Sequence, residues 1–162
     1  MKQTKVVIVT IVTCLFLSSC RITGSEQDNY LGFNPNAFTV VEEEDTHGGF
    51  HGDGSCYLIL DCSRNTEHAK KITQDWKQLP LTENLQLAMY GGEKNGIQYD
   101  YNFAEEAHWP IIRNGVYKFV DCHSEAIDKS DDTNLFSRYS FNFSIALYDL
   151  DTNILYYFEM DT

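Results

Sequence analysis

Apolar and polar residues alternate from Tyr139 to Ile145, near the C-terminus of this 162-residue chain. A period of two is typical of a β-strand that turns one face toward a core. The turn residues Asp151-Thr152-Asn153 separate this strand, Tyr139–Tyr148, from a second candidate, Ile154–Met160, which predicts an antiparallel hairpin. The side chains expected in the core are those of one face: Tyr139, Phe141, Phe143, Ile145 and Leu147.

The rest of the chain beyond Asn36 predicts more strands and one helix. Apolar residues at helical spacing (Ala69, Ile72, Thr73 and Trp76), with Asn65 as the cap, indicate the helix. Gly91-Gly92 and Asn95-Gly96 are hairpin signals. Residues 37–162 are therefore expected to form one α+β domain, an antiparallel sheet built from hairpins with one main helix packed on it. The further strand candidates are Phe38–Glu44, Ser55–Cys62, Leu85–Tyr90, Ile97–Phe103 and Val116–Cys122.

The charge balance excludes one class of partner. The chain has 24 acidic and 12 basic residues and a formal net charge of -12. Because neutralising phosphates requires a basic surface, we expect no nucleic-acid binding. A hydrophobic content of 43% is sufficient for a packed core.

The first 20 residues have the layout of a secretory signal peptide. Lys2 and Lys5 precede a largely apolar run of 12 residues from Val6 to Leu17. At 1.5 Å per residue, a helix of this length spans only about 18 Å of a hydrocarbon core about 30 Å thick. The run is therefore better suited to a cleaved leader than to a permanent membrane span.

The residues after the run, Leu17-Ser18-Ser19-Cys20, resemble the lipobox of bacterial membrane lipoproteins. The resemblance implies that residues 1–19 are removed and that Cys20 carries acyl chains, which hold the protein outside the cytoplasm on a lipid bilayer. Residues 20–36 then form a flexible tether, whose end can dock through Tyr30, Leu31 or Phe33. Two alternatives are a leader cleaved near Ser19, which releases a soluble protein, and a cytosolic protein with an apolar first helix.

Three cysteines follow Cys20, an odd number for an export compartment. Cys56 and Cys62 lie at opposite ends of one strand candidate, about 20 Å apart, and cannot form a disulfide with each other. Cys122 could pair with either, or all three could be buried thiols. No C-x-x-C pair supports redox or zinc chemistry.

A glycine-rich segment contains the candidate metal ligands His47, His51 and Asp53. Imidazole and carboxylate groups are the ligands that zinc and similar divalent ions prefer. The surrounding glycines do not favour the helix that would stack both histidines on one face, so a plain turn between strands is the alternative. A metal-dependent enzyme centred on this segment is one functional hypothesis, and no other cofactor is indicated.

Three tyrosines of the C-terminal hairpin, Tyr148, Tyr156 and Tyr157, form a candidate exposed row for binding a sugar or a partner protein. Core packing is the alternative explanation for these residues. No complete catalytic motif is present, so no catalytic residue is assigned. The preferred hypothesis is a binding or interaction module of the bacterial cell envelope, with an envelope protein or glycan as its partner. A passive spacer in an envelope complex is a further possibility, and the sequence leaves the oligomeric state open.

Overall fold

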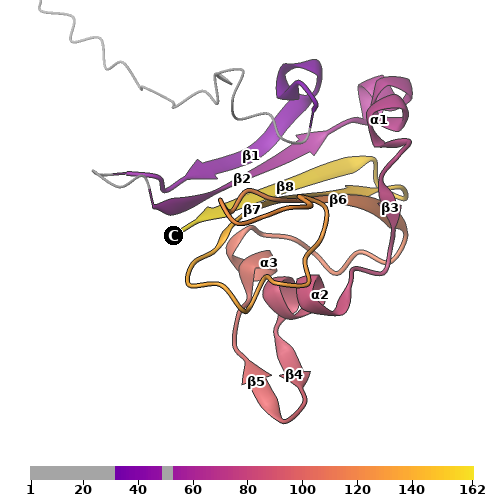
Figure 1. The fold of residues 1–162 in the computed structure, drawn as a ribbon. Helices are drawn as coiled ribbons and strands as arrows, with labels where there is room; N and C mark the ends of the chain where they lie inside the picture. Colours follow the sequence, from indigo (N-terminus) through magenta and orange to yellow (C-terminus); the bar gives the residue numbers. More distant parts are fainter. Residues whose placement is uncertain (1–31, 49–52) are drawn as a thin grey trace, which may run out of the picture.

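The computed structural model describes residues 32–48 and 53–162. Within these residues a six-stranded antiparallel sheet forms the centre of the molecule, and a small hairpin of β4 (Gly92–Lys94) and β5 (Ile97–Tyr99) projects from it (Figure 1). The α+β class predicted from the sequence is confirmed. In spatial order the sheet contains β1 (Thr39–Asp45), β2 (Gly54–Asp61), β8 (Ile154–Asp161), β7 (Asn142–Asp149), β6 (Gly115–Asp121) and β3 (Lys77–Gln78).

Helices cover both faces of this sheet (Figure 1). The helices α2 (Glu83–Tyr90) and α3 (Phe103–Glu106) pack on one face, and α1 (Thr66–Thr73) packs on the other. Two 3₁₀ turns, η1 (Pro35–Ala37) and η2 (Ser63–Asn65), precede β1 and α1. We call the two sides of the sheet the α2 face and the α1 face.

The C-terminal hairpin is confirmed as β7 and β8, which pair in continuous register from Asn142 with Asp161 to Asp149 with Ile154. On the α2 face, Phe143, Ile145 and Leu147 are buried as predicted. Tyr139, the first residue of the predicted strand, was also expected in the core. It lies before β7 begins and is 82% exposed.

The opposite face of β7 is also buried, with Ser144 and Ala146 fully inaccessible to solvent. Strand β7 lies between β8 and β6, and a central strand covered by helices on both sides has no solvent face. The protein therefore has two cores, one on each side of the sheet, where the sequence predicted one.

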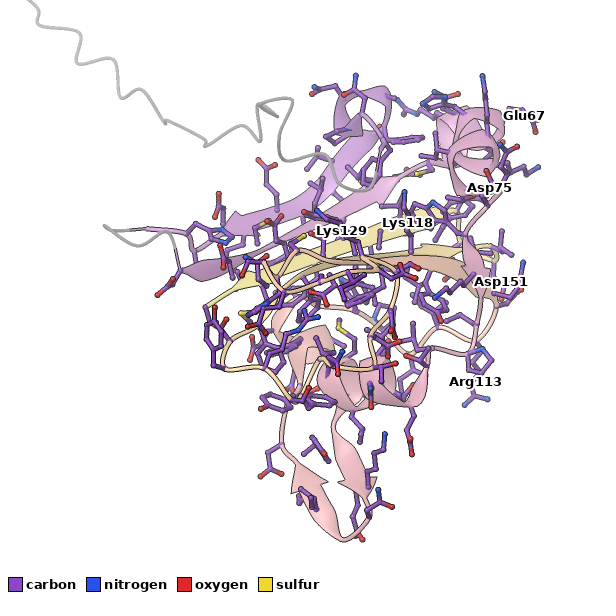
Figure 2. All side chains as sticks on the ribbon, in the orientation of Figure 1. Glu67, Asp75, Arg113, Lys118, Lys129 and Asp151 are labelled. Atoms are coloured by element: carbon purple, nitrogen blue, oxygen red, sulfur yellow. The ribbon has the colours of Figure 1, made fainter. Side chains whose placement is uncertain are left out.

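The predicted helix is confirmed as α1, and its Ala69 packs into the core of the α1 face. The helix ends at Thr73, so Trp76, the last residue of the predicted stripe, joins the same core from the segment after the helix. The charged Glu67 and Asp75 point outward (Figure 2). Asn65 is the N-cap residue of α1 as predicted, but its side chain forms no capping hydrogen bond and donates instead to the carbonyl of Ala37.

A second main helix replaces the predicted strand Leu85–Tyr90. Leu85, Ala88 and Met89 are buried at helical spacing in α2, and the Thr82 hydroxyl caps the helix by accepting from the Leu85 N–H. The predicted strand Ile97–Phe103 is shorter than expected, because β5 ends at Tyr99 and Phe103 begins α3.

The α1 face also holds the start of the described chain. Phe33 is buried there and contacts Tyr157 edge to face, with ring centroids 6.4 Å apart. Phe33 therefore docks as the sequence suggested, whereas Tyr30 and Leu31 lie outside the described residues.

Candidate functional site

Two of the three predicted metal ligands, His47 and Asp53, are among the described residues. His47 follows β1, and both its backbone N–H and its Nδ1 bind the Asp45 carboxylate, at 2.9 and 2.7 Å. Asp53 is exposed just before β2, and His51 lies outside the described residues. Across residues 32–48 and 53–162, no three histidine, cysteine or acidic side chains converge as a metal site. Because His51 is not among them, the metal hypothesis stays a prediction.

The expectation of an exposed tyrosine row is wrong. Tyr148, Tyr156 and Tyr157 are each 8% exposed or less. They also lie on two faces, Tyr156 on the α2 face and the other two on the α1 face. The reason is again the central position of β7 and β8, which buries both sides of each strand.

The three cysteines in the described part of the chain are free thiols. Cys56 and Cys62 are buried and Cys122 is half-buried. Burial raises the pKa of all three, for Cys62 to about 12. These side chains therefore act as small core residues rather than as nucleophiles.

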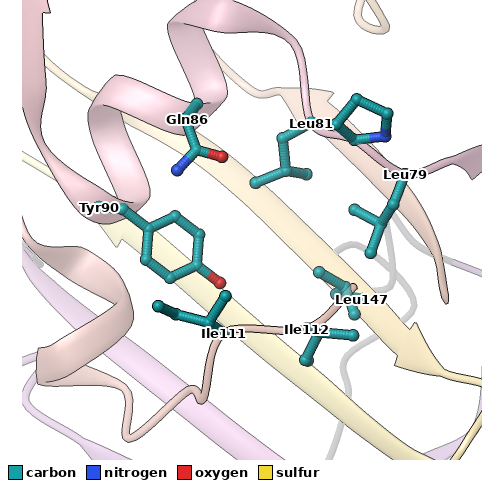
Figure 3. Close-up of a pocket in the computed structure, with 8 residues that line it drawn as sticks. Leu79, Leu81, Gln86, Tyr90, Ile111, Ile112 and Leu147 are labelled. Carbon is teal, nitrogen blue, oxygen red and sulfur yellow. The ribbon is translucent and has the colours of Figure 1, made fainter. Parts of the chain in front are cut away.

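An apolar pocket opens beside α2 (Figure 3). Its volume is about 140 Å³. An apolar protein cavity of about 150 Å³ can hold one benzene ring, so the pocket is large enough for a single apolar side chain or ring. Its wall consists of Leu79, Pro80, Leu81, Gln86, Tyr90, Ile111, Ile112 and Leu147.

Three segments far apart in the sequence build this pocket. Gln86 and Tyr90 are one helical turn apart and present the same side of α2. The Tyr90 hydroxyl donates to the carbonyl of Pro110 at 3.3 Å, which ties α2 to the segment that carries Ile111. Ile111 is 78% exposed. A bound group would therefore contact apolar side chains inside the pocket and the exposed Ile111 at its rim.

The pocket lining is mainly aliphatic and contains two polar side chains. Its ionisable lining residue, Tyr90, has its pKa raised by burial and stays neutral at physiological pH. The remaining polar lining residue is Gln86, whose amide can donate or accept a hydrogen bond. Such a lining can orient a bound apolar group through one polar contact.

A second cluster joins β1 to the segment after α3. The Glu42 carboxylate accepts from the Tyr57 hydroxyl at 2.9 Å and lies 2.7 Å from Nδ1 of His108. These two hydrogen bonds lower the pKa of Glu42. Burial and the contact with Glu42 raise the pKa of Tyr57 to about 12. His108 has a φ of 56°, a left-handed conformation that is uncommon for residues other than glycine.

Sequence reasoning missed both the pocket and this cluster. Glu42, Tyr57 and His108 are 15 to 66 residues apart in the chain, and no local pattern links them. The local signals for the pocket were Leu79-Pro80-Leu81 and Trp109-Pro110-Ile111-Ile112, two apolar segments outside the predicted strands.

No protein-family model, curated protein or solved structure matches this chain. Of the helices in the described part of the chain, none is both long and apolar enough to cross a bilayer.

Proposed function

We propose that this protein is a lipid-anchored, extracytoplasmic binding module of the bacterial cell envelope whose pocket beside α2 receives an apolar side chain of an envelope partner. Support for the anchor comes from the basic, apolar and lipobox-like segments of residues 1–20. Two or three acyl chains on Cys20 give durable attachment, because each buried methylene contributes about 0.8 kcal/mol.

The observation that carries the binding proposal is the pocket itself. The cavity has a volume of about 140 Å³ and is lined mainly by aliphatic side chains. One of them, Ile111, is exposed to solvent at the rim. Filling it would remove apolar surface from water on both molecules, at roughly 25 cal/mol for each Å². An anchoring side chain in a pocket is the usual centre of a protein–protein interface.

Site-specific photo-crosslinking in intact host cells tests this proposal. A photoreactive phenylalanine analogue replaces Ile111 at the pocket rim, and in a second strain it replaces the fully exposed Ile127, which does not line the pocket. We expect a discrete crosslinked product from position 111 and none from position 127.

A filled-pocket variant provides the control. Leu81→Trp places a large side chain in the pocket and should abolish the crosslink from position 111 while the protein remains folded by circular dichroism. Equal products from positions 111 and 127, or a crosslink that survives the filled pocket, would contradict the proposal.

A further inference from the structure

The outer edge of the sheet offers a surface separate from the pocket. Strand β1 is the last strand of the sheet, and its pairing partner among the described strands is β2. The ladder continues one residue beyond β1, where the Thr46 N–H donates to the carbonyl of Ser55. In an antiparallel pair, every second residue forms backbone hydrogen bonds with the partner strand. Counting back from Thr46 in steps of two, the backbone groups of Glu44 and Glu42 point toward β2. The backbone groups of Glu43 and Asp45 then point away from the sheet.

This edge is held in place before any partner arrives. The contacts of Glu42 with Tyr57 and His108 fix β1 against the body of the domain. A β-bulge between Val40 and Glu42 leaves Val41 without a paired residue on β2, and its side chain is 59% exposed. A rigid edge loses little conformational entropy when another strand pairs with it.

The charge of β1 decides what can pair with it. Four consecutive carboxylates, Glu42 to Asp45, occupy the strand. A second copy of β1 would place carboxylates opposite carboxylates, and like charges directly across a strand pair are destabilising. Alternating lysine or arginine side chains on an incoming strand would instead face opposite charges, while its backbone completes the open hydrogen bonds.

We propose that β1 receives an extended basic segment of a partner protein, which adds to the sheet as a seventh strand. Main-chain hydrogen bonds to Glu43 and Asp45 provide the affinity, and the carboxylates of β1 select the positive charge. Because the Glu42 and Asp45 carboxylates already contact His108 and His47, the charge selection falls mainly to Glu43 and Glu44. The apolar Val41 contributes contact area at the same edge.

A pair of variants at one position separates strand addition from general attraction between charges. Glu43→Gln removes the charge and keeps the backbone N–H, whereas Glu43→Pro removes both. The probe is an eight-residue peptide of alternating lysine and valine, titrated calorimetrically into the full protein as cells produce it, held in a zwitterionic detergent. We expect binding to Glu43→Pro to be about tenfold weaker than binding to Glu43→Gln.

Modified peptides repeat the test without changing the protein. N-methylation at every second residue blocks one hydrogen-bonding edge of the peptide and leaves its charge unchanged. We expect methylation of one edge to abolish binding and methylation of the other to have little effect. Equal affinities for Glu43→Gln and Glu43→Pro together with equal affinities for both methylated peptides would overturn the proposal, as would no measurable binding of the unmodified peptide. Crosslinking at Ile111 is independent of these results, so the pocket proposal is judged separately.

Discussion

At the scale of single residues, Glu42 connects the edge strand to the body of the domain. Its carboxylate binds a hydroxyl from β2 and an imidazole from the segment after α3. These contacts favour the ionised carboxylate, which is why the pKa of Glu42 is lowered below its usual value of 4.5. A group with a lowered pKa in the folded state stabilises the fold above its unfolded pKa and loses that effect in acid.

Replacement of this carboxylate should therefore lower the free energy of unfolding by an amount that depends on pH. We expect Glu42→Gln to be less stable than the wild type at pH 7, and the difference to shrink as the pH falls from about 4.5 through the lowered pKa of Glu42. Urea denaturation at pH 7 and pH 3 measures both differences. A difference that is constant or larger at pH 3 would contradict the role assigned to Glu42.

The buried pair of Asp121 and Arg138 allows a second prediction for single residues. The two side chains are only 2% and 9% exposed and bind each other. Removing one partner leaves an uncompensated buried charge, so Arg138→Met should lower the free energy of unfolding by about 3–5 kcal/mol. The double variant Asp121→Asn, Arg138→Met should recover part of this loss in urea denaturation. A single-variant cost below about 1 kcal/mol would mean that water reaches Asp121 in the absence of Arg138.

At the scale of elements, the ends of α2 show what turns a strand-like sequence into a helix. Thr82 caps its first turn, and Gly91 ends it with a φ of 69°, with its N–H bonded to the carbonyl of Leu87. A Cβ atom at Gly91 would lie 2.9 Å from the carbonyl oxygen of Tyr101. Both the backbone conformation, with its positive φ and a ψ of -173°, and the close approach therefore require glycine.

A matched pair of glycine variants separates these two effects. Gly96 also has a positive φ, 78°, but a Cβ there would meet no atom within 4 Å. We expect Gly96→Ala to cost about 1–2 kcal/mol from the backbone conformation alone, and Gly91→Ala to cost clearly more. Thermal unfolding of both variants checks the order, and equal costs would show that the contact with Tyr101 relaxes freely.

The elements also show what the sequence could and could not predict. The alternation of apolar and polar residues from Tyr139 to Ile145 identified β7, because a period of two is a local property of the chain. The prediction of a strand at residues 85–90 was wrong because a short apolar run is compatible with either a buried strand or a buried helix. The residue that decides for the helix, its cap Thr82, lies outside the run. The prediction of an exposed tyrosine row was wrong because it depends on the whole fold. Alternation within one strand does not reveal that both faces of the sheet are covered.

At the scale of the whole molecule, the pocket and the start of the described chain lie on opposite faces of the sheet. Phe33 packs on the α1 face and the pocket opens on the α2 face. Thirteen residue steps separate Phe33 from Cys20, and a chain of that length spans at most about 45 Å. An anchor at Cys20 would therefore keep the domain within about 45 Å of the bilayer.

The proposed anchor at Cys20 determines where the protein acts, and this residue lies outside those that the structure describes. The most direct measurement is the intact mass, with N-terminal fragmentation, of the protein purified from the membranes of its native host. We predict a chain that begins at Cys20 and carries a diacylglyceryl group on the sulfur of that residue. A chain that retains residues 1–19, or that has an unmodified thiol at Cys20, would contradict the account.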